Sequence, residues 1–394
     1  MKISPGGLST QPDRSGIHNA SMKSKKDISI ILIAVLTTLT WACRKEFVPD
    51  EPKYNYDDVN PDATPYTLNI PPFFAPMDVP ENNPLTEELV ELGRHLFWDV
   101  RLSGDNSQSC ATCHIPEASF SDPNQFSVGI NGELGNRQAM ACVNLGWHPN
   151  FFWDGRSPTL EEQVTEPVEN PIEMDENWDD LLVELSLTDL YPPMYAAAFT
   201  SDEITKERSA KALAAFLRTM MSGNSKFDRE RLGQYTYTEE EARGKDLFLK
   251  EGGDPENGQG GQWGADCFHC HGFGAGLFTD NLMHNNGLDS VFTDLGLGEV
   301  TGNPEDFGKF KTPTLRNIEL TAPYMHDGRF ETLEEVIDHY NSGGHPSSTI
   351  DPFMKYSDGG LQLSEQSKAD LKAFLLCLTD EDFTTNEAFS NPFE

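Results

Sequence analysis

The sequence predicts a mostly α-helical protein that contains two tandem domains of the same kind. Three segments of the chain occur twice, in the same order in each half, and a Cys-x-x-Cys-His run follows the first of them each time. The chain has 394 residues, which is enough for two domains of ordinary size. A duplicated helical unit therefore accounts for both the length and the internal repeats.

The chain is expected to begin with an export signal. An apolar run at 28–39, too short for a membrane span, follows several lysines, as in a signal peptide. We predict an upstream extension at 1–21, a signal peptide at 22–42 and an acidic, Pro-rich tether at 43–68. Cys43 lies in a loose match to a bacterial lipoprotein box, so it is the expected lipid anchor in the periplasm or cell envelope. Simple cleavage and an uncleaved anchor are the alternatives.

Each half is expected to begin and end with an amphipathic helix. The stretch 86–97 reads Thr-Glu-Glu and then Gly-x-x-Leu-Phe, and 238–248 repeats this pattern. In both copies threonine is the expected N-cap and the acids lie in the first turn. The pattern Ser-x-x-x-Leu-x-Ala-Phe-Leu occurs at 209–217 and again at 367–375, which predicts a second pair of helices.

These repeats place the boundary between the halves near 233–237. The expected domains are therefore 69–234 and 235–394. A Gly-rich stretch at 252–264 is expected to be a loop rather than a phosphate cradle, because no strand precedes it.

The Cys-x-x-Cys-His runs, at 110–114 and 267–271, point to covalent haem. Two thiols on one turn can add to the porphyrin vinyl groups while the adjacent histidine becomes an axial iron ligand. A zinc site or a dithiol redox pair is the alternative, but zinc does not need histidine directly after the second cysteine each time. We therefore predict two cytochrome c-like domains with haem c in each. The expected haem-binding residues are Cys110, Cys113, His114, Cys267, Cys270 and His271.

Two cysteines and the overall charge complete the composition. Cys142 and Cys377 could pair, but both lie among apolar neighbours, so buried free thiols are the expected state. The net charge of −35 excludes nucleic acid as a partner and could steer a basic redox protein to the surface.

The third repeat predicts a difference between the two haems. The segment that starts at Trp153 recurs from His326, 173 residues later. At that offset Tyr340 corresponds to Pro167. A phenolate can ligate ferric iron, whereas proline has no ligating side chain. We therefore expect an open first haem and a capped second haem.

Six motifs, one of which contains the first Cys-x-x-Cys-His run, support this interpretation. They are Phe-Trp-Asp-x-Arg-Leu-Ser at 97–103, Ser-Cys-x-x-Cys-His at 109–114, Phe-Trp-Asp-Gly-Arg at 152–156, Pro-Ile-Glu-Met at 171–174, Thr-Pro-Thr-Leu-Arg-Asn at 312–317 and Thr-Ala-Pro-Tyr-x-His-x-Gly at 321–328. With these motifs the chain, from about Asn69 onward, resembles the bacterial di-haem cytochrome c peroxidases and the related methylamine-utilisation (MauG-type) enzymes. The resemblance implies a peroxidatic N-terminal haem and an electron-transfer C-terminal haem. It also implies that Trp153 lies between the haems, with Gln163 and Glu173 at the peroxide site.

The sequence departs from the peroxidase pattern at three positions. Ile130 replaces a histidine that blocks the resting peroxidatic haem, and Tyr340 replaces a methionine ligand of the second haem, as in the MauG-type branch. Both departures argue against the usual reductive activation. The resemblance also implies calcium between the haems, with Gln138, Thr321 and Pro323 as its expected ligands, where Gln138 replaces an asparagine.

The predicted function is reduction of hydrogen peroxide at the first haem. The electrons would come through the second haem from a small cytochrome c or cupredoxin. One alternative is a MauG-type oxidase of an organic or protein substrate, and another is a di-haem electron carrier without turnover. An open first iron argues against the carrier. A homodimer and the identity of the donor are left open.

Overall fold

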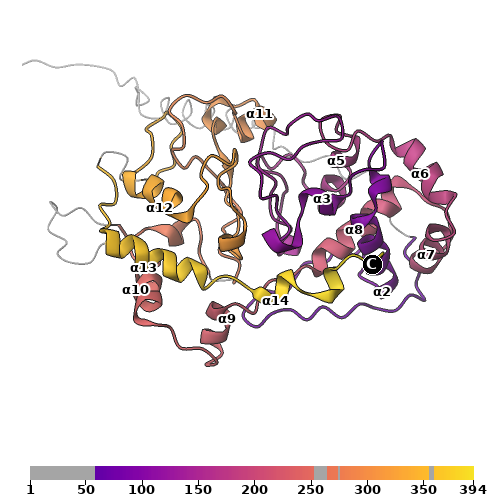
Figure 1. Ribbon diagram of the computed structural model, residues 1–394, viewed down its shortest axis with the longest axis horizontal. Coiled ribbons are helices and arrows are strands. Elements are labelled where there is room, and N and C mark those ends of the chain that lie inside the picture. The colour runs from indigo at the N-terminus through magenta and orange to yellow at the C-terminus, as the bar shows by residue number, and fades with distance from the viewer. Residues whose placement is uncertain (1–57, 253–263, 274–275, 355–358) are drawn as a thin grey trace, which may run out of the picture. The chain divides into compact units, whose positions relative to one another are not determined.

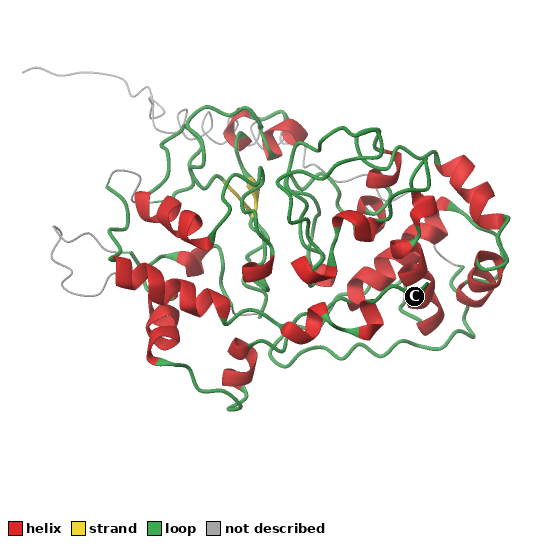
Figure 2. Cartoon of the chain, viewed as in Figure 1, coloured by secondary structure: helices red, strands yellow, loops and turns green. Residues whose placement is uncertain are grey.

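The computed structural model describes residues 58–252, 264–273, 276–354 and 359–394 (Figure 1). Helices and loops dominate this part of the chain (Figure 2), so the prediction of a mostly α-helical protein is confirmed. The only sheet among the described residues pairs β1 (Met283–His284) with β2 (Phe310–Lys311) in antiparallel register. No helix in these ranges is long and apolar enough to cross a membrane. The predicted extension, signal peptide and Cys43 anchor lie outside the described residues.

The helices follow the order that the repeats predict. In the first half they are α2 (Glu87–Trp98), α3 (Cys110–Cys113), α4 (Leu160–Gln163), α5 (Glu166–Glu169), α6 (Trp178–Ser186), α7 (Tyr191–Ala198) and α8 (Lys206–Thr219). They continue as α9 (Lys226–Arg231), α10 (Glu239–Phe248), α11 (Leu297–Thr301), α12 (Leu333–Ser342), α13 (Glu365–Leu376) and α14 (Glu381–Thr384).

The repeated N-caps form as expected. The Thr86 hydroxyl accepts the Leu89 N–H at 3.1 Å, and the Thr238 hydroxyl accepts the Glu241 N–H at 3.2 Å. Glu241 returns the contact to the Thr238 N–H at 2.9 Å, which completes a capping box. The caps fix where α2 and α10 begin, and thereby which face of each helix is buried.

Each half is built around one close helix crossing. In the first half α2 packs against α8, and in the second α10 packs against α13. A Cβ atom on Gly93 of α2 would lie 1.9 Å from the Ala212 carbonyl oxygen, and one on Gly244 of α10 would lie 1.9 Å from the Asp370 carbonyl oxygen. The repeated glycine therefore allows two helix backbones to touch in both halves.

Two hydrophobic clusters form the core. One contains α2, α6, α7 and α8, and the other contains α10, α12 and α13. The C-terminal tail crosses back to the first cluster, which it enters with Phe383 and Phe389 (Figure 1). The Phe389 carbonyl accepts the Trp98 indole N–H at 3.1 Å. The tail thus fastens the second half to the first.

Residues 58–68, which the sequence places in the tether, pack against the first half. Asp58 forms ion pairs with Arg208 and with Lys211, whose side chain is almost fully buried. The pKa of Asp58 is lowered by these two cations against the opposing effect of its burial. The Tyr66 N–H donates to the Leu85 carbonyl at 3.0 Å, so this segment is held by backbone as well as side-chain contacts.

Candidate active site

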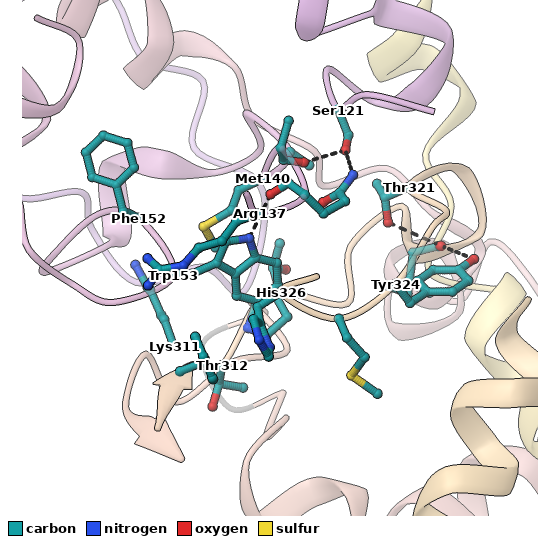
Figure 3. Close-up of a pocket in the computed structure, with 18 of the residues that line it drawn as sticks. Ser121, Arg137, Met140, Phe152, Trp153, Lys311, Thr312, Thr321, Tyr324 and His326 are labelled. Carbon is teal, nitrogen blue, oxygen red and sulfur yellow. Dashed lines mark hydrogen bonds between the residues drawn. The ribbon is translucent and has the colours of Figure 1, made fainter. Parts of the chain in front are cut away.

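One cavity of about 720 Å³ contains both Cys-x-x-Cys-His runs on its wall. Elements of both halves line it, and much of its surface is apolar. Figure 3 shows part of this wall, with Trp153 of the first half and His326 of the second half among the labelled residues. The predicted site residues on the wall are Cys110, Cys113, His114, Gln138, Trp153, Gln163, Glu173, Cys267, Cys270, His271, Thr321, Pro323 and Tyr340. The structure therefore brings together all of the residues that the sequence singled out for the site.

The two histidines of the runs are oriented in the same way. His114 Nδ1–H donates to the Phe120 carbonyl at 2.9 Å, and His271 Nδ1–H donates to the Phe278 carbonyl at 3.1 Å. Both phenylalanines have positive φ, 56° and 55°, which turns each carbonyl toward its histidine. The bond places the proton on Nδ1 and leaves the lone pair on Nε2, as in histidines that ligate metals. Burial lowers the pKa of both imidazoles, which favours the neutral ligating form.

The cysteines fit haem c as well. The four cysteines of the runs are free thiols on the cavity wall, and burial raises the pKa of Cys110, Cys267 and Cys270 to about 12. An apolar cavity with two thiols beside each correctly oriented imidazole matches what a covalently attached porphyrin needs. Cys142 and Cys377 are also free and buried, so the expectation of unpaired thiols is confirmed.

The two halves differ at the position equivalent to Tyr340. In the second half α12 runs unbroken through Tyr340, whose hydroxyl is buried at the cavity and accepts a hydrogen bond from Asn286 Nδ2 at 3.2 Å. Burial raises the pKa of Tyr340 to about 12, although that hydrogen bond acts in the opposite direction. In the first half the equivalent helix is interrupted between α4 and α5, and Pro167 lies on the wall in place of tyrosine.

His339, the neighbour of Tyr340, forms a hydrogen bond with another part of the chain. Its Nε2–H donates to the Asn286 carbonyl at 3.0 Å. Burial lowers the pKa of His339, which favours the neutral ring, and the Asn286 carbonyl occupies Nε2. Among the two adjacent side chains, Tyr340 is therefore the one that lines the cavity.

Glu173 lies at the wall of the first half. Its Oε1 accepts a hydrogen bond from Asn170 Nδ2 at 2.7 Å. Burial raises the pKa of Glu173 above the usual range of a glutamate, and the Asn170 hydrogen bond opposes part of that shift. A smaller pocket of about 250 Å³ is lined by Glu173 together with Arg156 and Glu166. The carboxyl group therefore borders both the main cavity and this second pocket.

The loop that carries Ile130 packs directly against the Glu173 segment. The Ile130 N–H donates to the Glu173 carbonyl at 2.9 Å. The Gly129 backbone lies so close to the Ile172 carbonyl that a Cβ atom there would be 2.2 Å from its oxygen. Gln163 ends α4 and lines the cavity on the same side.

Trp153 lies where the two halves meet. Its indole N–H donates to the Gln138 carbonyl at 2.8 Å (Figure 3). The Gln138 N–H donates to the His326 carbonyl, and the Lys311 N–H donates to the Trp153 carbonyl, each at 2.8 Å. The tryptophan, which is 9% exposed, is thus held by backbone bonds from both halves.

Comparison with known proteins identifies this arrangement. A sequence profile of the di-haem cytochrome c peroxidases matches residues 87–236. The chain is 38% identical to the methylamine utilization protein MauG of Methylorubrum extorquens over 306 residues, which covers 77% of this chain and 81% of that protein. It is 33% identical to the cytochrome-c peroxidase IdrP1 of Pseudomonas sp. strain SCT, covering 81% of this chain and 87% of that protein.

The chain belongs to the di-haem cytochrome c peroxidase family. A solved structure supports the same conclusion at the level of the fold. The crystal structure of a MauG-like protein associated with microbial copper homeostasis superposes with a TM-score of 0.75 at 35% identity, covering 84% of this chain and 100% of that one. The chain is therefore an oxidoreductase of the cytochrome-c peroxidase type, and the family implies haem c as its cofactor.

The three residues expected to bind calcium in this family member lie on the same wall. The Gln138 amide N–H group donates to the Ser121 hydroxyl and to the Asp122 carbonyl, both at 3.0 Å. Thr321 and Pro323 face the same region of the cavity. Carbonyl and amide oxygens are suitable calcium ligands, and calcium remains a prediction.

Two asparagines of this site were not predicted from the sequence. Asn170 lies three residues before Glu173. An asparagine this close in sequence to a carboxylate could have predicted the hydrogen bond between them. Asn286 contacts both Tyr340 and His339 from a distant loop. That contact depends on the tertiary fold and leaves no pattern in the sequence.

Proposed function

We propose that this di-haem enzyme reduces hydrogen peroxide at the N-terminal haem with electrons that arrive through the C-terminal haem. The observation that carries the proposal is the difference between the halves at one equivalent position. Pro167 offers no ligand in the first half, where Glu173 and Gln163 are close by, whereas Tyr340 faces the cavity in the second half. An open iron beside a carboxylate suits peroxide chemistry, and a capped iron suits electron transfer.

The residues of the first half can manage the protons of the reaction. Haem iron, when bound through His114, supplies the redox chemistry that breaks the O–O bond. The Glu173 carboxylate would take a proton from one peroxide oxygen and return it to the other, which then leaves as water. The Gln163 amide would orient the peroxide by a hydrogen bond. Since Glu173 also borders the second pocket, protons and peroxide would reach it from that side.

Electrons would be relayed by Trp153. Its indole is buried at the meeting of the two halves and donates to the Gln138 carbonyl of the first half, while the Trp153 backbone carbonyl accepts the Lys311 N–H of the second half. An oxidisable aromatic side chain in this place would shorten the electron-transfer distance between the two haems. The electrons would come from a small cytochrome c or cupredoxin.

The setting of the reaction is also a proposal. We infer that the enzyme acts in the periplasm or cell envelope, held by a lipid on Cys43, with calcium at Gln138, Thr321 and Pro323. Because Ile130 replaces the usual blocking histidine, peroxide would react without prior half-reduction of the enzyme.

A MauG-type oxidase is the second candidate. Tyr340 in the ligand position favours it, as does the 38% identity to a protein named MauG. Its substrate would be an organic molecule or a protein instead of a small redox donor.

One assay separates these candidates. The purified di-haem protein would be mixed with hydrogen peroxide and a reduced small cytochrome c or cupredoxin, and donor oxidation would be recorded under steady state. Sustained turnover in which the donor gives up two electrons for each peroxide consumed supports the peroxidase. A protein that hardly consumes peroxide with such donors, yet holds a long-lived oxidised state, would support the oxidase instead.

A further inference from the structure

A buried lysine on the cavity wall has no acidic partner. Four basic side chains other than histidine line the cavity: Arg137, Arg156, Lys311 and Arg316. The three arginines are paired with the carboxylates of Asp154, Asp294, Glu166 or Asp228. No carboxylate within the described ranges forms an ion pair with Lys311, which is 2% exposed.

Lys311 instead contacts two groups of the first half. Its ammonium donates to the Asn150 carbonyl and, at 2.9 Å, to His148 Nδ1. An ammonium carries three protons, so one N–H remains for another acceptor. Burial without an anion lowers the pKa of Lys311 to about 7, and a carboxylate in contact would raise it again.

His148 supplies a second donor next to the Lys311 ammonium. Because Nδ1 accepts from Lys311, the neutral ring carries its proton on Nε2. The pKa of His148 is far below its ordinary value owing to burial and the Lys311 charge, which agrees with a neutral ring. Nε2 is buried and has no hydrogen-bond partner in the part of the chain that the structure describes, and His148 lies on the cavity wall. Such a buried orphan donor is unfavourable unless a ligand satisfies it.

The chemistry of haem c identifies an acceptor. Once its vinyl groups are bonded to cysteines and its iron to histidine, the polar groups left on the porphyrin are the two propionate carboxylates. A carboxylate buried in a largely apolar cavity needs a cation and hydrogen-bond donors. Lys311 on β2 and His148, which follows the 3₁₀ turn Leu145–Trp147, offer both from opposite halves.

We propose that Lys311 and His148 form a carboxylate-binding site that holds one haem propionate at the meeting of the two halves. The Lys311 backbone N–H is bonded to the Trp153 carbonyl, so the bound propionate would lie near the proposed electron relay. The cation would stabilise the extra electron of the reduced haem and thereby raise its reduction potential.

The test uses the purified di-haem protein and two readouts other than turnover. The propionate bending bands are recorded by resonance Raman spectroscopy, and the midpoint potentials of both haems by spectroelectrochemical titration. Lys311→Met should shift the bending band of one haem and lower its equilibrium constant for reduction by about tenfold or more. His148→Phe should shift the same band to a smaller extent. This variant tests the proposal if the Lys311 variant does not fold.

Two further variants are the controls. Lys311→Arg keeps the cation and should keep the potential close to that of the wild type. Lys309→Met removes a neighbouring lysine that pairs with Asp306 and should change neither readout.

Other occupants of the site give different results. If the Raman bands and both potentials were unchanged in the Lys311 and His148 variants, the donors would bind water and the proposal would be wrong. A second outcome would also contradict the proposal. Acetate or bicarbonate added to the wild type would shift a reduction potential, while the propionate bands of the variants would stay unchanged. The site would then bind a free carboxylate instead of a haem propionate. Neither readout depends on Glu173, so failure of this proposal is separate from failure of the peroxidase assay.

Discussion

Glu173 is the residue on which the proposed proton transfer depends. Its carboxyl group faces the cavity, is bonded to Asn170 and has a pKa raised by burial. A raised pKa brings a carboxyl group closer to the working pH, which improves it as a proton shuttle. The same feature makes its contribution measurable as a function of pH.

We expect Glu173→Gln to slow peroxide consumption by about two to four powers of ten. In the wild type the rate should fall as the pH drops through the raised pKa, because the carboxylate becomes protonated and cannot accept a proton. The variant should lose this acidic limb of the pH–rate profile. Glu133→Gln, at an exposed position of the same half, is the matched control. An unchanged profile in the Glu173 variant would mean that this carboxyl group only packs.

Tyr340 is the residue that should set the properties of the second haem. Tyr340→Met is expected to raise its reduction potential, because a neutral thioether favours ferrous iron and an anionic phenolate favours ferric iron. Tyr340→Phe should abolish the wild-type low-spin spectrum of that haem. Tyr235→Phe, in the same half and outside the cavity wall, is the control. If Tyr340→Phe kept the low-spin spectrum, another ligand such as His326 would have to be tested.

At the scale of elements, the two helix crossings are the main determinant of packing. Gly244→Ala should reduce the free energy of unfolding by about 1–3 kcal/mol, because the added methyl group collides with the Asp370 carbonyl. Gly93→Ala should do the same at the Ala212 carbonyl in the first half. Chemical denaturation of the haem-loaded protein measures both.

Gly135→Ala is the control for this pair, since a Cβ there would have only ordinary contacts, the nearest at 3.7 Å. Equal stability of the Gly93, Gly244 and Gly135 variants would show that the crossings can separate at little cost.

The helices were predictable from sequence where the signal is local. Thr86 and Thr238 begin helices because a hydroxyl side chain can bond the exposed N–H groups of a first turn. The repeat also predicted that Tyr340 in the second half is equivalent to Pro167 in the first. The sequence did not predict that the carbonyls of Phe120 and Phe278 orient the histidines, because this depends on a backbone turn with positive φ. The Lys311–His148 contact joins positions 163 residues apart and is a product of the tertiary fold alone.

At the scale of the molecule, the proposal is that electrons pass between the two halves through Trp153. Trp153→Phe should leave the single-turnover reaction with peroxide nearly unchanged while steady turnover with a reduced donor falls. The reason is that the first iron would stay accessible while the proposed relay is removed. Stopped-flow and steady-state assays of the same preparation separate the two effects, and Trp147→Phe is the control. If donor oxidation proceeded at the wild-type rate, electrons would cross by another route.

The central claim is that the two haems of this molecule differ in coordination. The most direct measurement is the electronic and EPR spectrum of the ferric protein as purified. An open site beside Pro167 and Ile130 together with a Tyr340-ligated site predicts one high-spin and one low-spin haem. Two low-spin signals would contradict the account, because they would show that the first iron is capped in the resting enzyme.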